Sequence, residues 1–434
     1  MKYYNINNRA EVVDFETAVL NNVAKDGGLY IPCELPQVNI DFLKEIKNLS
    51  FKEISFNIGR TIFKDDIPDN ILATIIDKAF TFEPTIKELN EDIRVIELFN
   101  GPTLSFKDFA ARFMANYMSY LAEKYGKKLT VLVATSGDTG SAVANAFYGI
   151  DNIKVYVLYP SQRISKIQEM QIATFDENVQ PIEIEGTFDD CQGLVKKAFV
   201  DEDLNKKLNL TSSNSINVAR LVPQSLYYFY SVLKLIDDFN KKIAICVPSG
   251  NFGNLTAGIL SKKMGLPVYK YVAATNCNDS FIRFLKTGKF EPNPTIKTYA
   301  NAMDVGNPNN FQRLYALYNN SFEKIKSEIA GYSFDNNDMI DAIKYAYEYH
   351  GYVLEPHGAC GYKGIISFKN EVNNSHIYAF LETAHPGKFK DIVEMVLQVE
   401  IEIPESLKQC LSKKKNSIKL PDDFKVFKNY LIEN

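Results

Sequence analysis

The sequence contains 434 residues, of which 46% are apolar and 24% are charged, and its formal net charge is −4. At about 150 residues per domain this length predicts two to four structural units, and the composition excludes a wholly disordered chain. The near balance of charge argues against a nucleic-acid partner, and with only four histidines and six cysteines we expect neither a metal centre nor a dense disulfide scaffold.

Residues 1–93 carry a helical pattern of apolar side chains. Such side chains recur at helical spacing in residues 42–49 and again in residues 71–79. Four prolines, at positions 32, 36, 68 and 84, divide this region into short pieces. We therefore expect a mostly helical N-terminal extension.

After Ile93, apolar runs of strand length alternate with amphipathic helical stretches. This alternation predicts an α/β fold whose open parallel sheets are covered by helices on both faces. The expected strands are residues 129–134, 155–159, 182–184, 243–247, 268–273 and 377–381, and the expected helices are residues 140–148, 164–175, 189–200, 217–235 and 255–264.

The cysteines and the apolar runs indicate the compartment. No two cysteines have the C-x-x-C spacing of zinc ribbons or thioredoxin-type motifs, and scattered thiols are typical of a reducing compartment. The first residues lack the apolar stretch of a signal peptide, and the longest apolar runs are far shorter than a membrane span. We expect a cytoplasmic protein with no membrane partner.

Two strand-loop-helix turns have the residues of anion-binding sites. Segments 136–139 and 250–254 each follow an apolar strand and open a helix, where free backbone N–H groups and the helix dipole attract anions. The alternative is that both are ordinary turns with capping side chains. Gly250 and Gly253 are spaced G-x-x-G, which is neither the dinucleotide-binding pattern nor a P-loop, so nucleotide binding is disfavoured.

Lys107 lies in residues 99–113, where Pro102 indicates the start of a helix. The helix dipole disfavours a cation in this first turn, and Phe106 and Phe109 surround it with apolar surface. A desolvated ammonium there loses its proton more easily, and a Schiff-base lysine requires the neutral amine. The alternative is a surface lysine lying over the helix. Together with two anion turns, Lys107 favours pyridoxal phosphate, which needs a lysine for its aldehyde and a helix start for its phosphate.

Longer motifs follow one another along the chain: KDGGLYIP (25–32), FNGPTLSFKDFAARF (99–113), ATSGDTGSAVANAFYG (134–149), NSINVARLVPQ (214–224), VPSGNFGNLTAG (247–258), AATNCND (273–279), NAMDVGNPNN (301–310) and LETAHPGKF (381–389). In sequence and order they resemble the threonine synthases, pyridoxal-phosphate enzymes that share the fold of the tryptophan synthase β-subunit. The resemblance runs nearly from end to end. Its motifs are specific enough to separate the chain from dehydratases and cysteine synthases of the same fold.

The resemblance implies a role for each matching residue. Lys107 would carry the cofactor as a Schiff base and shuttle protons. Thr383, after the last expected strand, would hydrogen-bond the pyridine nitrogen without holding it protonated. The cofactor phosphate would be held by Gly250, Asn251, Phe252, Gly253 and Asn254, the substrate carboxylate by Ser136, Gly137, Asp138 and Thr139, and the substrate phosphate by Ser215 and Arg220.

Three residues near these positions keep an alternative open. Asp138 is an acid in an anion site, and we expect its side chain to cap the helix instead of meeting the ligand. Arg220 could pair at the surface instead of binding phosphate. His385 could act as an acid or base, or it could be a structural histidine beside Pro386.

The resemblance also implies the architecture and the reaction. Residues 1–93 would form the extension, residues 94–112 and 225–434 the larger cofactor-binding lobe, and residues 113–224 a smaller mobile lobe. The reaction would be γ-elimination of phosphate from O-phospho-L-homoserine and addition of water at Cβ to give L-threonine, the last step of threonine biosynthesis. The alternatives are another elimination enzyme, such as a dehydratase, or a catalytically silent homologue. The oligomeric state, monomer or homodimer, stays open.

Overall fold

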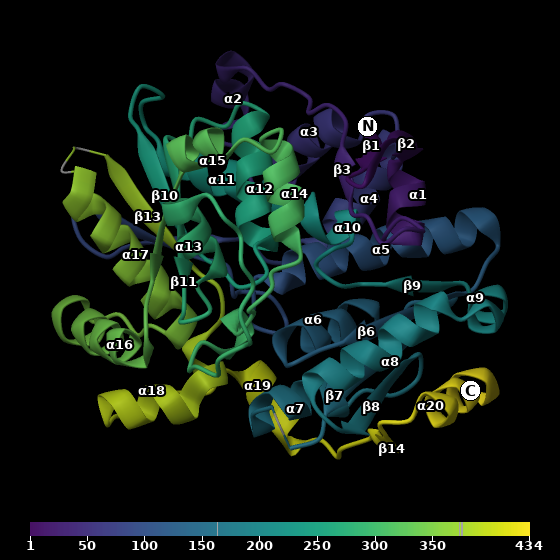
Figure 1. The fold of residues 1–434 in the computed structure, drawn as a ribbon. Coiled ribbons are helices and arrows are strands. Elements are labelled where there is room, and N and C mark those ends of the chain that lie inside the picture. Colours follow the sequence, from purple (N-terminus) through teal and green to yellow (C-terminus); the bar gives the residue numbers. More distant parts are fainter. Residues whose placement is uncertain (163, 373, 375) are drawn as a thin grey trace.

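The strands of the computed structural model form three sheets within the described residues, which are 1–162, 164–372, 374 and 376–434. A six-stranded and a five-stranded sheet are mainly parallel, and a three-stranded antiparallel sheet belongs to the N-terminal region. Figure 1 shows the six-stranded sheet at the upper left and the five-stranded sheet at the lower right, with helices packed around both. This arrangement confirms the expected α/β fold with parallel-sheet lobes.

The N-terminal region is mostly helical, as expected, and it also carries the small sheet. Helix starts are marked by capping side chains, as at Ser50, which forms a capping box with Glu53. The small sheet was not predicted, because its longest strand is largely exposed and has no buried apolar run. The elements are β1 (Lys2–Asn5), β2 (Asn8–Asp14), α1 (Phe15–Asn21), β3 (Tyr30–Pro32), α2 (Ile40–Ile46), α3 (Phe51–Phe63) and α4 (Asp69–Ala79).

The six-stranded sheet has the order β12-β11-β10-β13-β5-β4, and its neighbouring strands are parallel except for β4 and β5. Its strands are β4 (Thr85–Glu88), β5 (Ile93–Glu97), β10 (Ile243–Pro248), β11 (Lys270–Thr275), β12 (Ile329–Ser333) and β13 (Ile377–Glu382). Ile245 in β10 packs into one core and Cys246 into another on the opposite face. A strand covered on both faces reads as a continuous apolar run, which is why the sequence identifies β10.

Helices of this half cover both faces of the six-stranded sheet. In Figure 1, α12 and α17 lie on different sides of β10. The elements are α11 (Gln224–Leu235), α12 (Gly253–Lys263), α13 (Ser280–Thr287), η1 (Asn301–Met303), α14 (Asn310–Leu317), α15 (Phe322–Glu328), α16 (Asn336–His350), α17 (Pro356–Val372), η2 (Pro386–Phe389), α18 (Lys390–Leu397) and α19 (Glu405–Ser412).

The five-stranded sheet has the order β14-β8-β7-β6-β9, with all neighbours parallel. Val131 and Val133 of β6 pack on one face, and Leu132 and Ala134 pack on the other. The elements are α5 (Lys107–Tyr125), β6 (Leu129–Ala134), α6 (Asp138–Phe147), β7 (Ile153–Pro160), α7 (Lys166–Ala173), β8 (Val179–Glu185), α8 (Phe188–Val200), α9 (Glu202–Leu208), β9 (Leu210–Ser212), α10 (Val218–Leu221), β14 (Ile418–Pro421) and α20 (Phe424–Glu433).

The end of the chain returns to the five-stranded sheet, whereas the expected lobe boundaries placed all of residues 225–434 in the larger lobe. Strand β14 pairs with β8, and Phe427 and Leu431 of α20 are buried in the core of that sheet. This pairing stabilises the fold, because the segment covers the open edge of β8 and buries apolar side chains. Apart from this segment, the expected division into two lobes stays a prediction.

Proline explains one further difference. Residues 217–235 were expected as one helix, but α10 ends at Leu221 and α11 begins at Gln224, with Pro223 between them. Proline has no N–H and its ring clashes with the preceding turn, so the helix cannot run through it.

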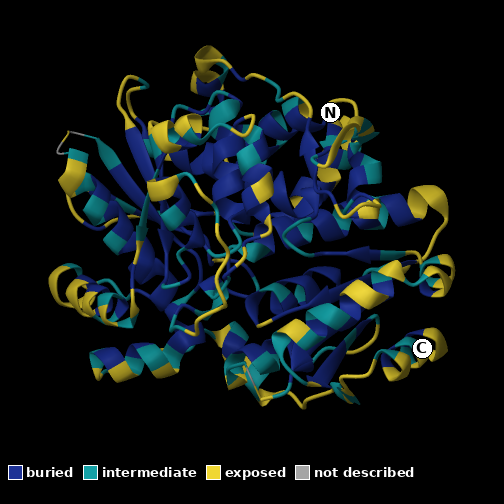
Figure 2. Ribbon diagram, viewed as in Figure 1, coloured by how far each residue is buried: buried dark blue, intermediate teal, exposed yellow. Residues whose placement is uncertain are grey.

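Burial is continuous from one sheet to the other. Figure 2 shows buried residues along the strands of both sheets and on the inner sides of their helices, with exposed residues on the outer helices and loops. In the part of the chain that the structure describes, no helix is both long enough and apolar enough to cross a membrane.

Candidate active site

Lys107 is the first residue of α5, in the turn that the sequence indicates. Its side chain is 14% exposed, and the Nζ atom lies 5.2 Å from the centre of the Phe106 ring. Burial lowers the pKa of the Lys107 amine, Asp138 raises it, and Lys388 lowers it again. The lysine therefore has the desolvated environment that the sequence led us to expect, and it also has a carboxylate neighbour.

Asp138 lies between two lysines. Its Oδ2 atom is 3.3 Å from Lys107 Nζ and its Oδ1 atom is 2.8 Å from Lys388 Nζ. Burial alone would raise the pKa of the Asp138 carboxyl, but Lys388 and Lys107 together hold it well below its usual range. The expectation that Asp138 caps its helix is wrong, because its carboxylate contacts lysine and glutamine side chains and, within the described residues, accepts no hydrogen bond from an N–H group of α6. Instead, Thr135 Oγ1 accepts hydrogen bonds of 3.0 and 2.8 Å from two N–H groups of this turn.

Lys388 is a site residue that the sequence reasoning missed. It lies in η2, its side chain is fully buried, and its Nζ donates a 2.9 Å hydrogen bond to the Thr103 carbonyl oxygen. A buried lysine is rare unless it is paired, so its position needs an explanation. The only sequence signal was its place in the motif at residues 381–389, because many other lysines of this chain are ordinary surface residues.

The turn at residues 136–139 is connected through Gln168 to Asn301, which belongs to the half of the protein with the six-stranded sheet. Gly137 has φ 146°, and a Cβ there would lie 2.7 Å from Gln168 Nε2, so only glycine fits. Gln168 Nε2 donates a 3.4 Å hydrogen bond to Asp138 Oδ1, and Gln168 Oε1 accepts one of 3.4 Å from Asn301. Ser136 is exposed and Thr139 is partly exposed, so both side chains are open to a ligand.

The turn after β10 has the geometry of a phosphate cradle. Phe252 takes the left-handed conformation with φ 58° just before α12, and no side chain caps that helix. A Cβ on Gly250 would lie 2.7 Å from Met303 Cα, so only glycine allows the two segments to approach. Asn254 accepts hydrogen bonds from two tyrosines, while its buried Nδ2 has no partner among the described residues. Uncapped N–H groups and an unpaired buried amide suit an anion.

A buried histidine, His357, holds the segment at Ala302 and Met303 that packs against Gly250. His357 Nε2 accepts a 3.1 Å hydrogen bond from Ala302 N–H, so its proton is on Nδ1, which lies 2.5 Å from Glu355 Oε2. Glu355 and His357 are both buried. Because Ala302 precedes the residue that approaches Gly250, this pair supports the cradle. The sequence reasoning missed both residues.

Ser215 and Arg220 lie on the segment that leads into and through α10. Asn251 Nδ2 donates a 2.6 Å hydrogen bond to Ser215 Oγ, which places Ser215 beside the cradle. Arg220 is buried and donates a 2.6 Å hydrogen bond from Nη1 to the Ser213 carbonyl oxygen. Its Nε has no partner among the described residues, and burial lowers the pKa of Arg220 to about 10. A surface ion pair, the alternative for Arg220, is therefore wrong.

Thr383 follows β13 and is buried beside the start of α5. Its carbonyl oxygen accepts a 2.9 Å hydrogen bond from Phe106 N–H, so it lies next to the lysine helix. His385 Nδ1 accepts a 3.0 Å hydrogen bond from Gly387 N–H and caps η2, and burial and then Lys388 lower the pKa of its imidazole. This capping contact favours the structural alternative for His385.

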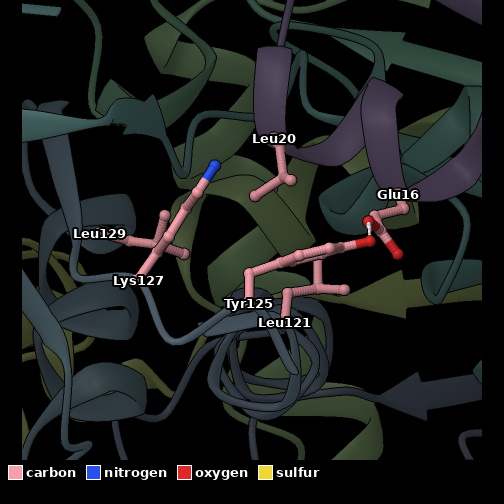
Figure 3. Close-up of a pocket in the computed structure, with 6 residues that line it drawn as sticks. All are labelled: Glu16, Leu20, Leu121, Tyr125, Lys127 and Leu129. Carbon is pink, nitrogen blue, oxygen red and sulfur yellow. Dashed lines mark hydrogen bonds between the residues drawn. The ribbon is translucent and has the colours of Figure 1, made fainter. Parts of the chain in front are cut away.

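A cavity of about 120 Å³ lies elsewhere, between α1, the end of α5 and the start of β6. It is lined by Glu16, Leu20, Leu121, Tyr125, Lys127 and Leu129, and in Figure 3 the Tyr125 hydroxyl contacts the Glu16 carboxylate. At 1.5 Å per residue, the length of α5 separates it from Lys107 by roughly 27 Å. It contains none of the expected site residues.

Comparisons with known proteins identify the family of the chain. Residues 80–382 match the family of pyridoxal-phosphate dependent enzymes. Residues 2–80 match the threonine synthase N terminus, and residues 358–431 match the threonine synthase C-terminal region. The chain belongs to the threonine synthase family.

Individual threonine synthases agree over the whole chain. Those of Escherichia coli (strain K12) and of Buchnera aphidicola subsp. Schizaphis graminum are 40% and 42% identical to it, each with full coverage of both chains. The crystal structure of the Escherichia coli threonine synthase superposes with a TM-score of 0.92, at 40% identity and full coverage of both chains. The pyridoxal-phosphate-bound threonine synthase of Brucella melitensis gives 0.94 at 32% identity, over 100% of this chain and 99% of that one.

These similarities confirm the expected class of enzyme. The chain is a pyridoxal-phosphate-dependent lyase of the threonine synthase type. The residues also fit that cofactor: a desolvated Lys107 stands ready for its aldehyde, and the uncapped start of α12 with the unpaired Asn254 amide suits its phosphate. Within the described ranges, no group of three or more histidine, cysteine, aspartate or glutamate side chains is arranged to hold a metal ion.

Proposed function

We propose that the chain converts O-phospho-L-homoserine and water to L-threonine and inorganic phosphate, with Lys107 as the catalytic residue. One observation carries the proposal: the Asn251–Ser215 contact places the uncapped start of α12 beside the segment that leads to the buried Arg220, so two groups suited to anions belong to one site. A cofactor phosphate accounts for one of them. A second phosphate, on the substrate, accounts for the other.

When bound, pyridoxal phosphate supplies an aldehyde for an amine and a conjugated ring that spreads the negative charge left on carbon. Lys107 Nζ would hold the cofactor through its aldehyde, and the same atom, once freed by the substrate amine, would accept the substrate α-proton. Burial and the nearby Lys388 favour the neutral amine that this step needs. Lys107 can then return the proton, because it is held within the site by the start of α5.

The remaining residues bind and orient. The N–H groups at the start of α12 and the side-chain amide of Asn254 would hold the cofactor phosphate, and the Thr383 hydroxyl would serve the pyridine nitrogen. Ser215 and Arg220 bind the substrate phosphate, and Arg220 supplies a charge that has no carboxylate within ion-pair distance in the described residues. Residues 136–139 receive the substrate carboxylate.

The five-stranded half closes on the substrate in this proposal and excludes water until water must add at Cβ. The contacts across the site that would change are polar. Gln168 meets Asn301, and Gln171 Nε2 donates a 3.2 Å hydrogen bond to the Thr103 carbonyl oxygen. A cytoplasmic location is supported by the cysteines, which are all unpaired.

A substrate panel tests the proposal. The purified chain is offered O-phospho-L-homoserine, L-serine and L-threonine, and released phosphate, threonine and 2-oxo acids are measured. We expect threonine and phosphate in equal amounts from phosphohomoserine, and little 2-oxo acid from the others. The variant Lys107→Ala should lose turnover, while Lys128→Ala, at an exposed position, should keep it. Faster release of 2-oxo acid from serine or threonine would favour a dehydratase instead.

A further inference from the structure

Lys107, Lys388 and Asp138 form a cluster with two positive charges and one negative charge. Lys107 and Lys388 both contact Asp138, so two ammonium groups share a single carboxylate. The two contacts are unequal: Lys388 is 2.8 Å from Asp138 and fully buried, whereas Lys107 is 3.3 Å away and 14% exposed. Lys388 is also held by the Thr103 carbonyl oxygen. The carboxylate is therefore bound mainly to Lys388.

Lys107 must lose its positive charge during the proposed reaction. As the proposed catalytic residue, it must give up its positive charge to bind an aldehyde and again to accept a proton from carbon. If Asp138 had only Lys107 as its partner, each of these steps would leave a buried carboxylate with no counter-ion, which is strongly unfavourable. With Lys388 in place, Asp138 stays paired whatever the state of Lys107.

Binding of the substrate carboxylate also requires that the negative charge of Asp138 be neutralised. Residues 136–139 are proposed to receive a carboxylate, and Asp138 is an acid in that very turn. An unpaired Asp138 would repel the substrate. Lys388 neutralises it from behind, through a side chain that solvent does not reach.

We propose that Lys388 is a positioning residue of the active site, which holds Asp138 as its own ion-pair partner and so leaves Lys107 free to act as a neutral amine. This inference rests on the proposed function of Lys107. No role in binding the cofactor or the substrate is assigned to Lys388, because its contacts are to Asp138 and Thr103.

Other charged groups face this cluster and do not replace Lys388. Arg220, on α10, acts on Lys107 in the same direction as Lys388 but more weakly. His357, on α17, is the next titratable group near Asp138, but its Nε2 accepts the Ala302 N–H, so it does not replace Lys388 as a counter-ion. Among the described residues, Lys388 also acts on Asp108 on α5, His385 before η2 and Cys410 on α19.

Acylation of amines in the full-length chain, freed of cofactor, tests the proposal without relying on turnover. The chain is treated with acetic anhydride at a series of neutral to alkaline pH values, and modification at Lys107, Lys388 and Lys128 is measured by mass spectrometry. We expect Lys107 to react at lower pH than the exposed Lys128, and Lys388 to resist modification while the protein stays folded. Equal reactivity of Lys388 and Lys107 would overturn the proposal, and this arm needs no variant.

The decisive variant is Lys388→Met, which removes the charge and keeps the length. Asp138 then has Lys107 as its remaining lysine partner, so the midpoint for acylation of Lys107 should rise by about one pH unit, a tenfold change in neutral amine at a given pH. In the double variant Asp138→Asn/Lys388→Met the midpoint should return to the original value or below. Lys390→Met, two residues away and paired with Glu394, should change nothing.

The pH dependence of kcat in the cofactor-bound enzyme provides a second measurement. In Lys388→Met the acid limb of kcat should move to higher pH, and the double variant should restore it. An unchanged midpoint in folded Lys388→Met, or a loss that the double variant does not restore, would contradict the proposal. If the original chain does not turn over phosphohomoserine at all, the proposed function fails instead, and the acylation midpoints still report on the Lys388–Asp138 pair.

Discussion

The Phe106 N–H donates a 2.9 Å hydrogen bond to the Thr383 carbonyl oxygen, and this bond joins the start of α5 to the end of β13. Ser105 and Ala384 form an antiparallel bridge beside it. Lys107 and Thr383 are thus fixed relative to each other by the main chain and not by their own side chains. Substituting either side chain should leave this geometry in place, so that the effect reports on chemistry.

Replacing Thr383 with valine removes the hydroxyl and keeps the shape of the side chain. We expect kcat to fall about tenfold, because the hydrogen bond proposed to the pyridine nitrogen is lost. Steady-state kinetics and the cofactor absorption spectrum check this, and the spectrum should change together with the rate. Thr383→Ser keeps a hydroxyl and should stay close to the original rate. Full activity in Thr383→Val would remove Thr383 from the site.

Replacing Arg220 with methionine removes a buried charge that has no carboxylate within ion-pair distance in the described residues. The fold should therefore survive, while the KM for phosphohomoserine rises about ten- to a hundredfold, the range expected for lost hydrogen bonds to a charged group. Cofactor binding, followed by absorbance, should be unchanged. The control is Arg60→Met, at an exposed ion pair on α3. An unchanged KM would argue that the substrate phosphate binds elsewhere.

Adding a methyl group at Gly250 should weaken cofactor binding. The new Cβ would lie 2.7 Å from Met303 Cα and 2.9 Å from the Ala302 carbonyl oxygen, so one segment of the cradle must move. Titration of the cofactor-free protein with pyridoxal phosphate measures the effect. In Gly193→Ala, a Cβ meets nothing within 4 Å, and alanine suits helix α8 better than glycine. Equal affinity in the two variants would mean that the cradle is not where cofactor binds.

Glu382 should make the protein less stable as the pH rises. Burial and then the neighbouring Glu355 raise the pKa of the Glu382 carboxyl well above its ordinary value. The folded protein therefore keeps this proton to higher pH than the unfolded chain does, which loses it above about pH 4.3. Stability from this group is complete below that pH and is lost as the pH rises.

Glu382→Gln removes the titration and keeps the shape of the side chain. Denaturant unfolding should show the variant to be more stable than the original chain at neutral pH, with a difference that disappears as the pH falls below about 4. The same difference at every pH would show that packing, and not the proton, is responsible.

Much of the sheet could be predicted, because strands buried on both faces are continuous apolar runs. Residues 129–134 and 243–247 became β6 and β10 almost without change. Strands β9 and β12 were missed because each is a short edge strand with few apolar residues. Pairing of β14 with β8 joins residues more than two hundred positions apart, and only the folded sheet brings them together.

The site was predicted where a residue is unusual in its local context, and missed where its partner is distant. Lys107 stands out because a lysine is unfavourable in the first turn of a helix. Lys388 and His357 look ordinary in the sequence, and their importance comes from contacts with Asp138 and Ala302. The same lack of three-dimensional information led to the wrong capping role for Asp138, since nothing near it in sequence indicates two lysines.

Reduction of the holoenzyme with borohydride tests the central claim most directly. Borohydride fixes pyridoxal phosphate to whichever amine holds it, and mass spectrometry of the digested protein then locates the label. We expect one label for each chain, on Lys107, and loss of that label when phosphohomoserine is added before reduction. Label on Lys388 or on another lysine, or no label in a protein that still forms threonine, would contradict it.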